Sequence, residues 1–243
     1  MNADRHHRHE QKDGASTPGA PSWHVVLTGP RTPDQRREAL DFLSVSRGFR
    51  PGTWDAVHQC PECGSDQHGT PSLRLTSLAR RRHGTGLPDD ATPVPCVSFS
   101  RAGGWLATAW LEPDAAQTGW RIGVDIEVVT GPAFATADGL GPAESSVGFS
   151  GAEQQAVAGL PEGQQAAVRA TLWAVKEAVV KALGTGFRAD PSELTVARTD
   201  PATGGLRLEV PDHPEAVVVL GTDWPGGDLP EGQVGAVVLL SVG

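Results

Sequence analysis

The sequence predicts an α+β fold of two similar lobes, each an antiparallel sheet packed against helices. Helix signals and short valine-rich strand segments occur in both halves of the chain, and turns rich in Gly and Pro separate them. A chain of 243 residues with 38% hydrophobic content is long enough for one sizeable unit or two small lobes. We expect lobes at residues 23–119 and 120–243, with the helix and strand signals stronger in the second.

The first lobe follows residues 1–22, which are polar, rich in His, Gly and Pro, and predicted to be a disordered tail. Thr32 before Pro33 indicates a helix start, with apolar residues between 39 and 45 on its buried side. The stretches "PCVSFS" and "WLATAWLE", joined by "RAGG", predict a strand hairpin.

The second lobe begins with a predicted strand, "WRIGVDIEVV". Ser150 and Glu153 have the spacing of a capping box, which places a helix start there. Pro161 and Gly184 bracket a longer helix. Four further segments, "LTVAR", "LRLEV", "AVVVL" and "VGAVVLLSV", are predicted strands because Asp, Pro and Gly clusters separate them.

Composition narrows the function. The formal net charge of -9 argues against a surface that binds nucleic acid. We expect no membrane partner, because no apolar run approaches the roughly 18 residues that a spanning helix needs. The N-terminus lacks the apolar core of a secretory signal, and the three cysteines fit a reducing compartment, so we expect a cytoplasmic protein.

Two carboxylates stand side by side on the strand "IGVDIEV". Alternate residues of a strand share a face, so Gly123, Asp125 and Glu127 point one way and the apolar residues point the other. Neighbouring like charges destabilise each other unless water solvates them well or a cation lies between them. Two interpretations stay open at this point: a solvated strand face, or a cation site with room for a ligand beside the glycine.

The helix "LWAVKEAVVKALG" carries two of the three lysines of the chain. Glu177 and Lys181 have the spacing of an ordinary surface ion pair, but Ala, Val and Trp surround them. Charges in apolar surroundings need a partner such as a metal or an anionic ligand. The oxygen ligands Asp125, Glu127 and Glu177 favour a hard cation, and Mg²⁺ with open positions for phosphate oxygens fits best.

The motifs "IGVDIE" and "WAVKEAVVKALGTGF", about 50 residues apart, resemble the two signatures of the 4'-phosphopantetheinyl transferases, and the chain length resembles the monomeric Sfp-like type. The resemblance implies a pseudo-twofold pair of lobes with the active site at their interface. It implies that Asp125, Glu127 and Glu177 bind Mg²⁺. Lys181 matches the lysine on the coenzyme A phosphates, and Lys176 matches the lysine before the motif glutamate; the resemblance assigns both to coenzyme A binding.

Further coenzyme A contacts follow from weaker resemblances. "HGTPSL" is similar to a segment that lies against coenzyme A, which assigns Gly69, Thr70 and Pro71 to that role. "VSFSRAGGW" is similar to a motif on the nucleotide phosphates, which assigns Ser100 and Arg101. Thr70 stands where lysine is common and Arg101 where histidine is common. Arginine is a good phosphate ligand, whereas the threonine removes a charge.

The resemblance implies Mg²⁺-dependent transfer of the 4'-phosphopantetheine arm of coenzyme A to a serine of an apo acyl or peptidyl carrier protein, leaving adenosine 3',5'-bisphosphate. Such carriers serve polyketide, nonribosomal peptide or fatty acid synthesis. Glu177 is the expected proton acceptor and Lys181 assists the leaving phosphate. Two alternatives stay open: a catalytically impaired relative that only binds carrier protein or coenzyme A, and an unrelated Mg²⁺-dependent phosphohydrolase that uses the same carboxylates.

Cys60 and Cys63 have Cys-x2-Cys spacing, with His58 and His68 nearby. A structural zinc site usually needs four ligands in a recognisable pattern, and here a single cysteine pair is present. A turn that merely contains two thiols is the favoured interpretation, and zinc is the alternative.

Overall fold

Two three-stranded antiparallel sheets and the helices on their outer faces form the body of the protein. The computed structural model describes residues 21–60, 63–66, 69–77, 79, 94–134, 148–184, 191–198, 206–210, 216–224 and 228–241. Most of the predicted tail and His68 lie outside these residues. Among the helices described, none is long and apolar enough to cross a membrane.

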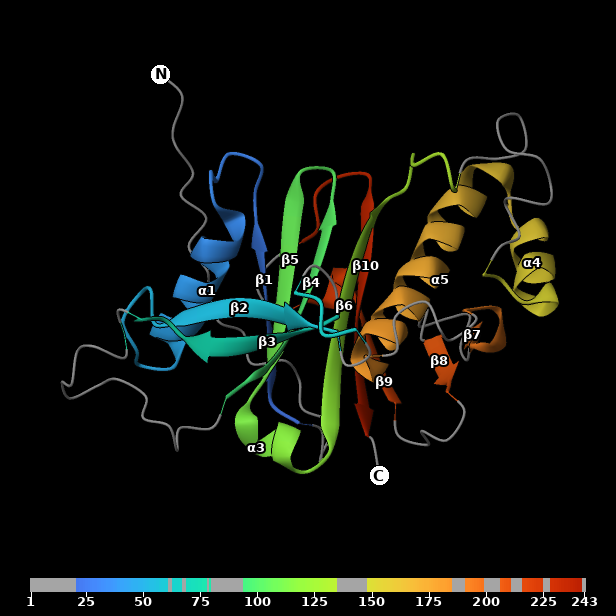
Figure 1. Ribbon diagram of the computed structural model, residues 1–243. Helices are drawn as coiled ribbons and strands as arrows, with labels where there is room; N and C mark the ends of the chain where they lie inside the picture. Colours follow the sequence, from blue (N-terminus) through green and yellow to red (C-terminus); the bar gives the residue numbers. More distant parts are fainter. Residues whose placement is uncertain are drawn as a thin grey trace, which may run out of the picture.

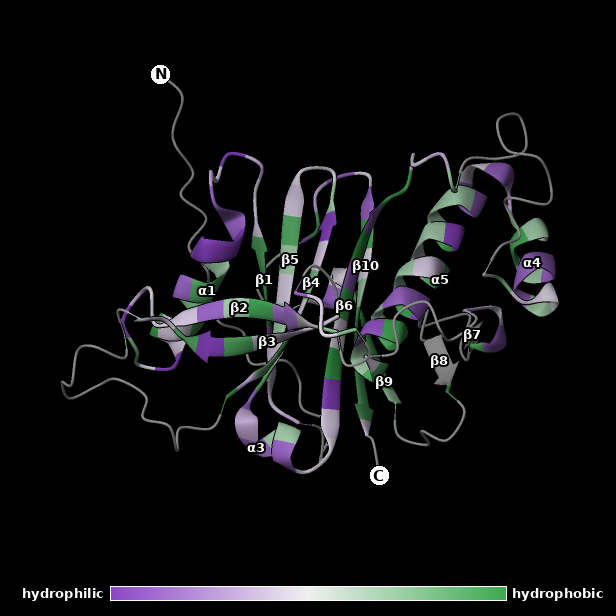
Figure 2. Ribbon diagram, viewed as in Figure 1, coloured by the Kyte–Doolittle hydropathy of each residue, from purple (hydrophilic) through white to green (hydrophobic). Residues whose placement is uncertain are grey.

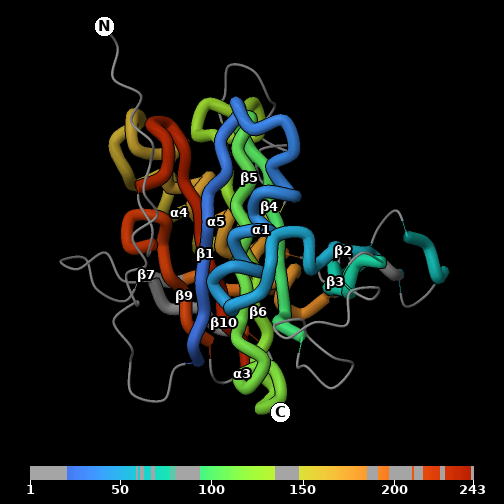
Figure 3. Tube along the Cα trace, turned by 90° about the vertical axis from the view of Figure 1, so that its left-hand side faces the viewer, coloured from blue at the N-terminus to red at the C-terminus, as the bar shows by residue number. Residues whose placement is uncertain are grey.

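The first sheet has the strand order β1–β5–β4. Its strands are β1 (Trp23–Thr28), β4 (Cys96–Ala102) and β5 (Trp105–Leu111). Helix α1 (Gln35–Ser46) and the hairpin of β2 (Trp54–Gln59) and β3 (Thr70–Leu75) pack on its outer face around Leu40, Leu43 and Trp54. Figure 3 shows the hairpin projecting sideways beyond the sheets.

The second sheet has the strand order β6–β10–β9. Its strands are β6 (Trp120–Val128), β9 (Ala216–Leu220) and β10 (Gln233–Ser241), and the short helix α3 (Pro113–Gln117) precedes β6. Helix α5 (Glu162–Leu183) lies along its outer face, and α4 (Gly151–Ala158) packs beyond α5 (Figure 1). Strands β7 (Thr195–Arg198) and β8 (Leu206–Glu209) form a small hairpin beside this sheet.

The inner faces of the two sheets share one apolar core. Strands β5, β6 and β10 are green over much of their length in Figure 2, as expected for strands covered on both sides. The core residues come from β1, β5, β6 and β10: Val25, Ala107, Ala109, Leu111, Ile122, Val124, Ile126, Val237 and Leu239.

The sheets also meet along β4 and β6, where side chains replace main-chain pairing. The hydroxyl of Ser98 accepts the amide of Val124 at 3.1 Å, and the hydroxyl of Ser100 accepts the amide of Ile126 at 3.3 Å. Buried amides need such acceptors. These two hydrogen bonds fix the position of β6 along β4, and with it the position of the side chains on β6.

The mixed α and β architecture with antiparallel sheets is confirmed, and the pseudo-twofold relation between the lobes stays a prediction. Two local expectations are wrong. Helix α1 begins at Gln35 and not next to Thr32. Its N-cap is Asp34, whose side chain accepts the backbone amide of Arg37. Val45 is 57% exposed and does not join the core. The capping box of Ser150 and Glu153 is present as predicted.

Candidate active site

Strand β6 sends its acidic and apolar side chains to opposite faces, as the alternation predicts. The apolar side chains of the stretch 122–126 pack between the sheets. Gly123 faces the backbone of α5, and the side chain of Asp125 contacts Lys181 of α5. The carboxylates are therefore turned away from the core between the sheets and toward the helix that carries the second motif.

Gly123 allows α5 to press against β6. A Cβ at this position would lie 1.8 Å from the carbonyl oxygen of Ala178, so any larger residue would force the helix away. One of the two interpretations of the sequence left room for a ligand beside this glycine. In the structure the backbone of α5 takes that space, and the close approach is what brings Glu177 and Lys181 to the acidic strand.

Asp125 is the centre of the site. It is 3% exposed. Its Oδ1 accepts two bonds, at 2.7 Å from Ser100 Oγ and at 2.6 Å from Lys181 Nζ. Its Oδ2 is buried and has no partner within the described part of the chain. Burial raises the pKa of Asp125, against the lowering by the Lys181 ammonium. One carboxylate oxygen is thus saturated and the other is left for a ligand.

Glu127 and Glu177 complete an acidic cluster. Burial, and then the charge of Asp125, raise the pKa of Glu127 to about 7, with Lys181 and the Trp173 indole acting in the opposite sense. Burial and the charge of Asp125 also raise the pKa of Glu177. Oε1 of Glu177 is another buried oxygen that lacks a partner among the described residues. Three coupled carboxylates and one ammonium leave an excess of negative charge that a cation would relieve.

The donor set fits Mg²⁺, although it is not a closed cage. Within the described residues, no three His, Cys, Asp or Glu side chains are grouped closely enough to hold a metal by themselves. Mg²⁺ is commonly held by one or two carboxylates together with substrate phosphates and water. The unpartnered oxygens of Asp125 and Glu177 satisfy that smaller requirement.

Lys176 does not reach this site, and its expected coenzyme contact is wrong in this structure. Its side chain is fully buried. Its ammonium donates to the Gly148 carbonyl at 2.8 Å, Glu153 Oε2 at 2.6 Å and the Pro191 carbonyl at 2.8 Å. An ammonium has three N–H donors, so these acceptors use all of them. Lys176 is a structural residue that ties α5 to α4 and to two loop ends.

The segment around Thr70 does approach the second motif. Thr70 begins β3, and its Oγ1 lies 2.9 Å from where a Cβ on Gly184 would stand. Gly184 ends α5 with a φ of +70°. The neighbouring Gly69 carbonyl lies 3.0 Å from the His58 ring, and Pro71 pairs with His58 across the hairpin. The tip of the β2–β3 hairpin therefore lies beside the C-terminal end of α5.

Ser100 and Arg101 point to opposite faces of β4, so they do not act as one pair. Ser100 is buried on Asp125, whereas Arg101 is exposed and donates to Gln35 Oε1 at 2.5 Å, at the start of α1. Beside it, the Arg36 guanidinium lies 5.0 Å from the centre of the Phe99 ring. The alternation of side chains along the strand "SFSRA" indicates these opposite faces, whereas the family resemblance assigns both residues to the nucleotide phosphates.

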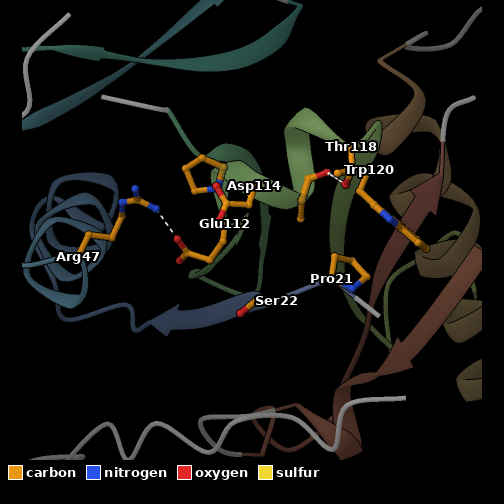
Figure 4. Close-up of a pocket in the computed structure, with 9 residues that line it drawn as sticks. Pro21, Ser22, Arg47, Glu112, Asp114, Thr118 and Trp120 are labelled. Carbon is orange, nitrogen blue, oxygen red and sulfur yellow. Dashed lines mark hydrogen bonds and ion pairs between the residues drawn. The ribbon is translucent and has the colours of Figure 1, made fainter. Parts of the chain in front are cut away.

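A cavity of about 570 Å³ lies away from the acidic cluster, at the start of α3 and β6. Figure 4 shows Arg47 paired with Glu112 at one side and Trp120 at the other. The lining residues are Pro21, Ser22, Arg47, Glu112, Pro113, Asp114, Ala115, Thr118 and Trp120. None of the predicted site residues lines this cavity.

Cys60 and Cys63 lie in a tight turn after β2. The amide of Gly64 donates to the Cys60 carbonyl at 2.9 Å, and the Cys60 amide donates to the Ser65 carbonyl at 2.9 Å. Cys60 is buried and Cys63 is exposed. The described residues group no third His, Cys, Asp or Glu with them, so the thiol-bearing turn remains the favoured interpretation.

Comparison with known protein families finds a match over the part of the chain that carries the two motifs. Residues 121–226 match the model of the 4'-phosphopantetheinyl transferase superfamily. The matched span is less than half of the chain, and it holds Asp125, Glu127, Glu177 and Lys181 together with the α5 contact at Gly123. The superfamily match therefore covers the whole acidic cluster and leaves the first lobe unmatched.

Two solved structures align with half of the chain. They are titled "Chronobacterium ammoniagenes ACPS-CoA complex" and "Chronobacterium ammoiniagenes apo-ACPS structure". Each shares 18% identity and a TM-score of 0.38 over 50% of this chain, and the alignments cover 96% and 95% of those chains. A likeness at this level does not establish a common fold. Among curated proteins, none matches the chain significantly.

Proposed function

We propose that this protein is a Mg²⁺-dependent 4'-phosphopantetheinyl transferase of the Sfp-like type. It would transfer the phosphopantetheine arm of coenzyme A to a serine of an apo acyl or peptidyl carrier protein, and release adenosine 3',5'-bisphosphate. The observation that carries the proposal is the acidic cluster inside the superfamily match, where buried oxygens of Asp125 and Glu177 lack partners among the described residues beside Lys181.

Asp125, Glu127 and Glu177 would hold Mg²⁺ together with phosphate oxygens of coenzyme A and water. When bound, Mg²⁺ supplies positive charge against the pyrophosphate of coenzyme A and against the charge that develops on it during transfer. Support comes from the donor chemistry: oxygen ligands only, pKa values of Glu127 and Glu177 that burial and the charge of Asp125 raise, and unpartnered oxygens on Asp125 and Glu177 among the described residues.

Lys181 would stabilise the leaving phosphate. Its side chain is 29% exposed, in contrast with the buried Lys176. Two acceptors engage its ammonium, Asp125 Oδ1 at 2.6 Å and the Val124 carbonyl at 3.2 Å. An ammonium carries three N–H donors, so one remains for a phosphate oxygen. The ammonium beside the cluster favours an anionic ligand over a neutral one.

Glu177 would accept the proton of the attacking serine, directly or through water. Burial raises its pKa, which makes its carboxylate a stronger base than an exposed glutamate. The hydroxyl attacks the β-phosphorus of coenzyme A, the phosphorus–oxygen bond to the adenosine bisphosphate breaks, and the proton passes to the carboxylate. Alignment of these groups is the main task of the protein in such a transfer.

Coenzyme A would lie along the edge where the hairpin tip meets the end of α5. Thr70 lies against that end of the helix with Gly69 and Pro71 on either side of it in the chain, which supports the proposed contact of these three residues with the coenzyme. Arg101 would meet an anionic group only on the α1 side of β4, because its side chain points there. We propose that a single chain supplies both lobes, and that the enzyme works as a monomer in the cytoplasm.

The test is the intact mass of an apo carrier protein after incubation with this protein, coenzyme A and Mg²⁺. We expect a gain of one phosphopantetheine arm that disappears when Mg²⁺ is chelated. No gain with several acyl and peptidyl carriers, with coenzyme A still bound, would support the impaired relative instead. Phosphate released from coenzyme A without any carrier would support the phosphohydrolase.

A further inference from the structure

We infer that Ser100 is a positioning residue that fixes which oxygen of Asp125 faces the reaction site. This inference rests on the proposed function, because it concerns the same site. It changes the role of Ser100: family resemblance assigns this serine to the coenzyme, whereas the geometry assigns it to the carboxylate.

The Ser100 hydroxyl has both of its strong interactions inside the protein. It donates to Asp125 Oδ1 at 2.7 Å and accepts the amide of Ile126 at 3.3 Å. The residue is 7% exposed. A hydroxyl has one hydrogen to donate, so a hydroxyl that donates to Asp125 has none left for a phosphate oxygen.

The consequence for Asp125 is a fixed rotation of its carboxylate. Ser100 approaches from β4 and Lys181 from α5, and both donate to Oδ1. Oδ2 is left buried and without a partner among the described residues. Without the serine, Lys181 alone would hold the carboxylate. Rotation about the Cβ–Cγ bond of Asp125 would then exchange its two oxygens at little cost. Partners that orient a ligating carboxylate typically contribute 10–100-fold to metal affinity or activity.

Ser98 provides a matched control two residues earlier on β4. It is also buried, at 3% exposure, and its hydroxyl accepts the amide of Val124 at 3.1 Å. The described contacts of Ser98 include no carboxylate. Replacing either serine by alanine therefore removes one acceptor from a buried β6 amide, and only the Ser100 replacement also removes a donor from Asp125.

The experiment compares wild type with Ser100→Ala, Ser98→Ala and Ser100→Thr. Mn²⁺, which prefers the same oxygen ligands as Mg²⁺, is titrated into each protein with coenzyme A present, and the free ion is followed by electron paramagnetic resonance. Transfer to an apo carrier then gives kcat and the KM for coenzyme A. Thermal unfolding of all four proteins corrects for the amide that both alanine variants leave unpaired.

We expect Ser100→Ala to weaken Mn²⁺ binding about 10-fold or more and to lower kcat, with the KM for coenzyme A within about 3-fold of wild type. Ser98→Ala should match wild type in Mn²⁺ affinity, and it should lower the unfolding temperature less than Ser100→Ala, which also removes a donor from a buried carboxylate. Ser100→Thr, which keeps the hydroxyl, should recover most of the metal affinity.

Two results would overturn the inference. Equal Mn²⁺ affinity in Ser100→Ala and wild type, with a raised KM for coenzyme A, would make the serine a coenzyme ligand and leave the transferase standing. Absence of Mn²⁺ binding in wild type with coenzyme A would overturn both the inference and the proposed function. If wild type transfers nothing but its Mn²⁺ affinity still depends on Ser100 and not on Ser98, the function fails and the inference holds.

Discussion

Replacing Lys176 by methionine tests whether this lysine is structural. Methionine keeps the length of the side chain but removes the ammonium from a fully buried position. Three acceptors then lose the ammonium as a donor: the carboxylate of Glu153 and the carbonyls of Gly148 and Pro191. Glu153 is only 4% exposed, so water does not replace the lost charge without opening the structure.

The expected cost is large. Breaking a buried ion pair by removing one partner costs about 3–5 kcal/mol, because the remaining charge stays buried. Two unsatisfied carbonyls act in the same direction, although the contributions do not add in full. Since domains are typically stable by about 5–15 kcal/mol, a loss of at least about 3 kcal/mol should be plain in urea unfolding.

The double variant Lys176→Met with Glu153→Gln measures the pair itself. Removing both charges leaves no buried unpaired ion, so we expect the double variant to be more stable than Lys176→Met alone. A Lys176→Met protein that loses less than about 1 kcal/mol of stability, but binds coenzyme A at least 10-fold more weakly, would refute the structural role. It would restore the coenzyme contact that the family resemblance implies.

Three further predictions concern β6 and α5. Gly123→Ala should lower the free energy of unfolding by about 3 kcal/mol, since the new Cβ would meet the Ala178 carbonyl at 1.8 Å, whereas Gly163→Ala in open space on α5 should cost nothing; equal unfolding midpoints would contradict this. In metal-free protein, Glu127 has a pKa of about 7 when folded and about 4.3 when unfolded. The folded state therefore holds more protons between these values, and stability should fall as pH rises from about 4.5 to 7, with a flatter profile in Glu127→Gln. Thermal scans at several pH values check it, and an unchanged slope in that variant would be the contrary result. Glu177→Ala should abolish transfer in the carrier mass assay, and turnover near that of wild type would remove Glu177 from the mechanism.

Local pattern was enough wherever one element decides the outcome. The alternation of β6 predicted that Asp125 and Glu127 share a face, and the spacing of Ser150 and Glu153 predicted a capping box that the structure contains. The bracket of Pro161 and Gly184 gave the limits of α5 within a residue. These features follow from periodicity and capping, which act over a few residues.

Contacts between segments that are distant in the sequence could not be predicted from local sequence patterns. Glu153 is the partner of Lys176 across 23 positions, and the same glutamate also accepts the amide of Val196. The spacing of Ser150 and Glu153 predicts only the capping role of this glutamate. The Ser100 contact with Asp125 joins positions 25 apart on two strands whose register no sequence rule fixes.

The sequence by itself determined the chemistry of this protein: an Asp-x-Glu strand, a helix with glutamate and two lysines, and the order and spacing of the two. Tertiary structure decided what each group does. The two lysines lie five positions apart on α5, which turns them by about 500° in all, so they point to different sides of the helix. Lys176 meets Glu153 in the buried core, and Lys181 meets Asp125 at a partly exposed site. A charge takes its role from the partners and the water around it, and only the folded chain sets these.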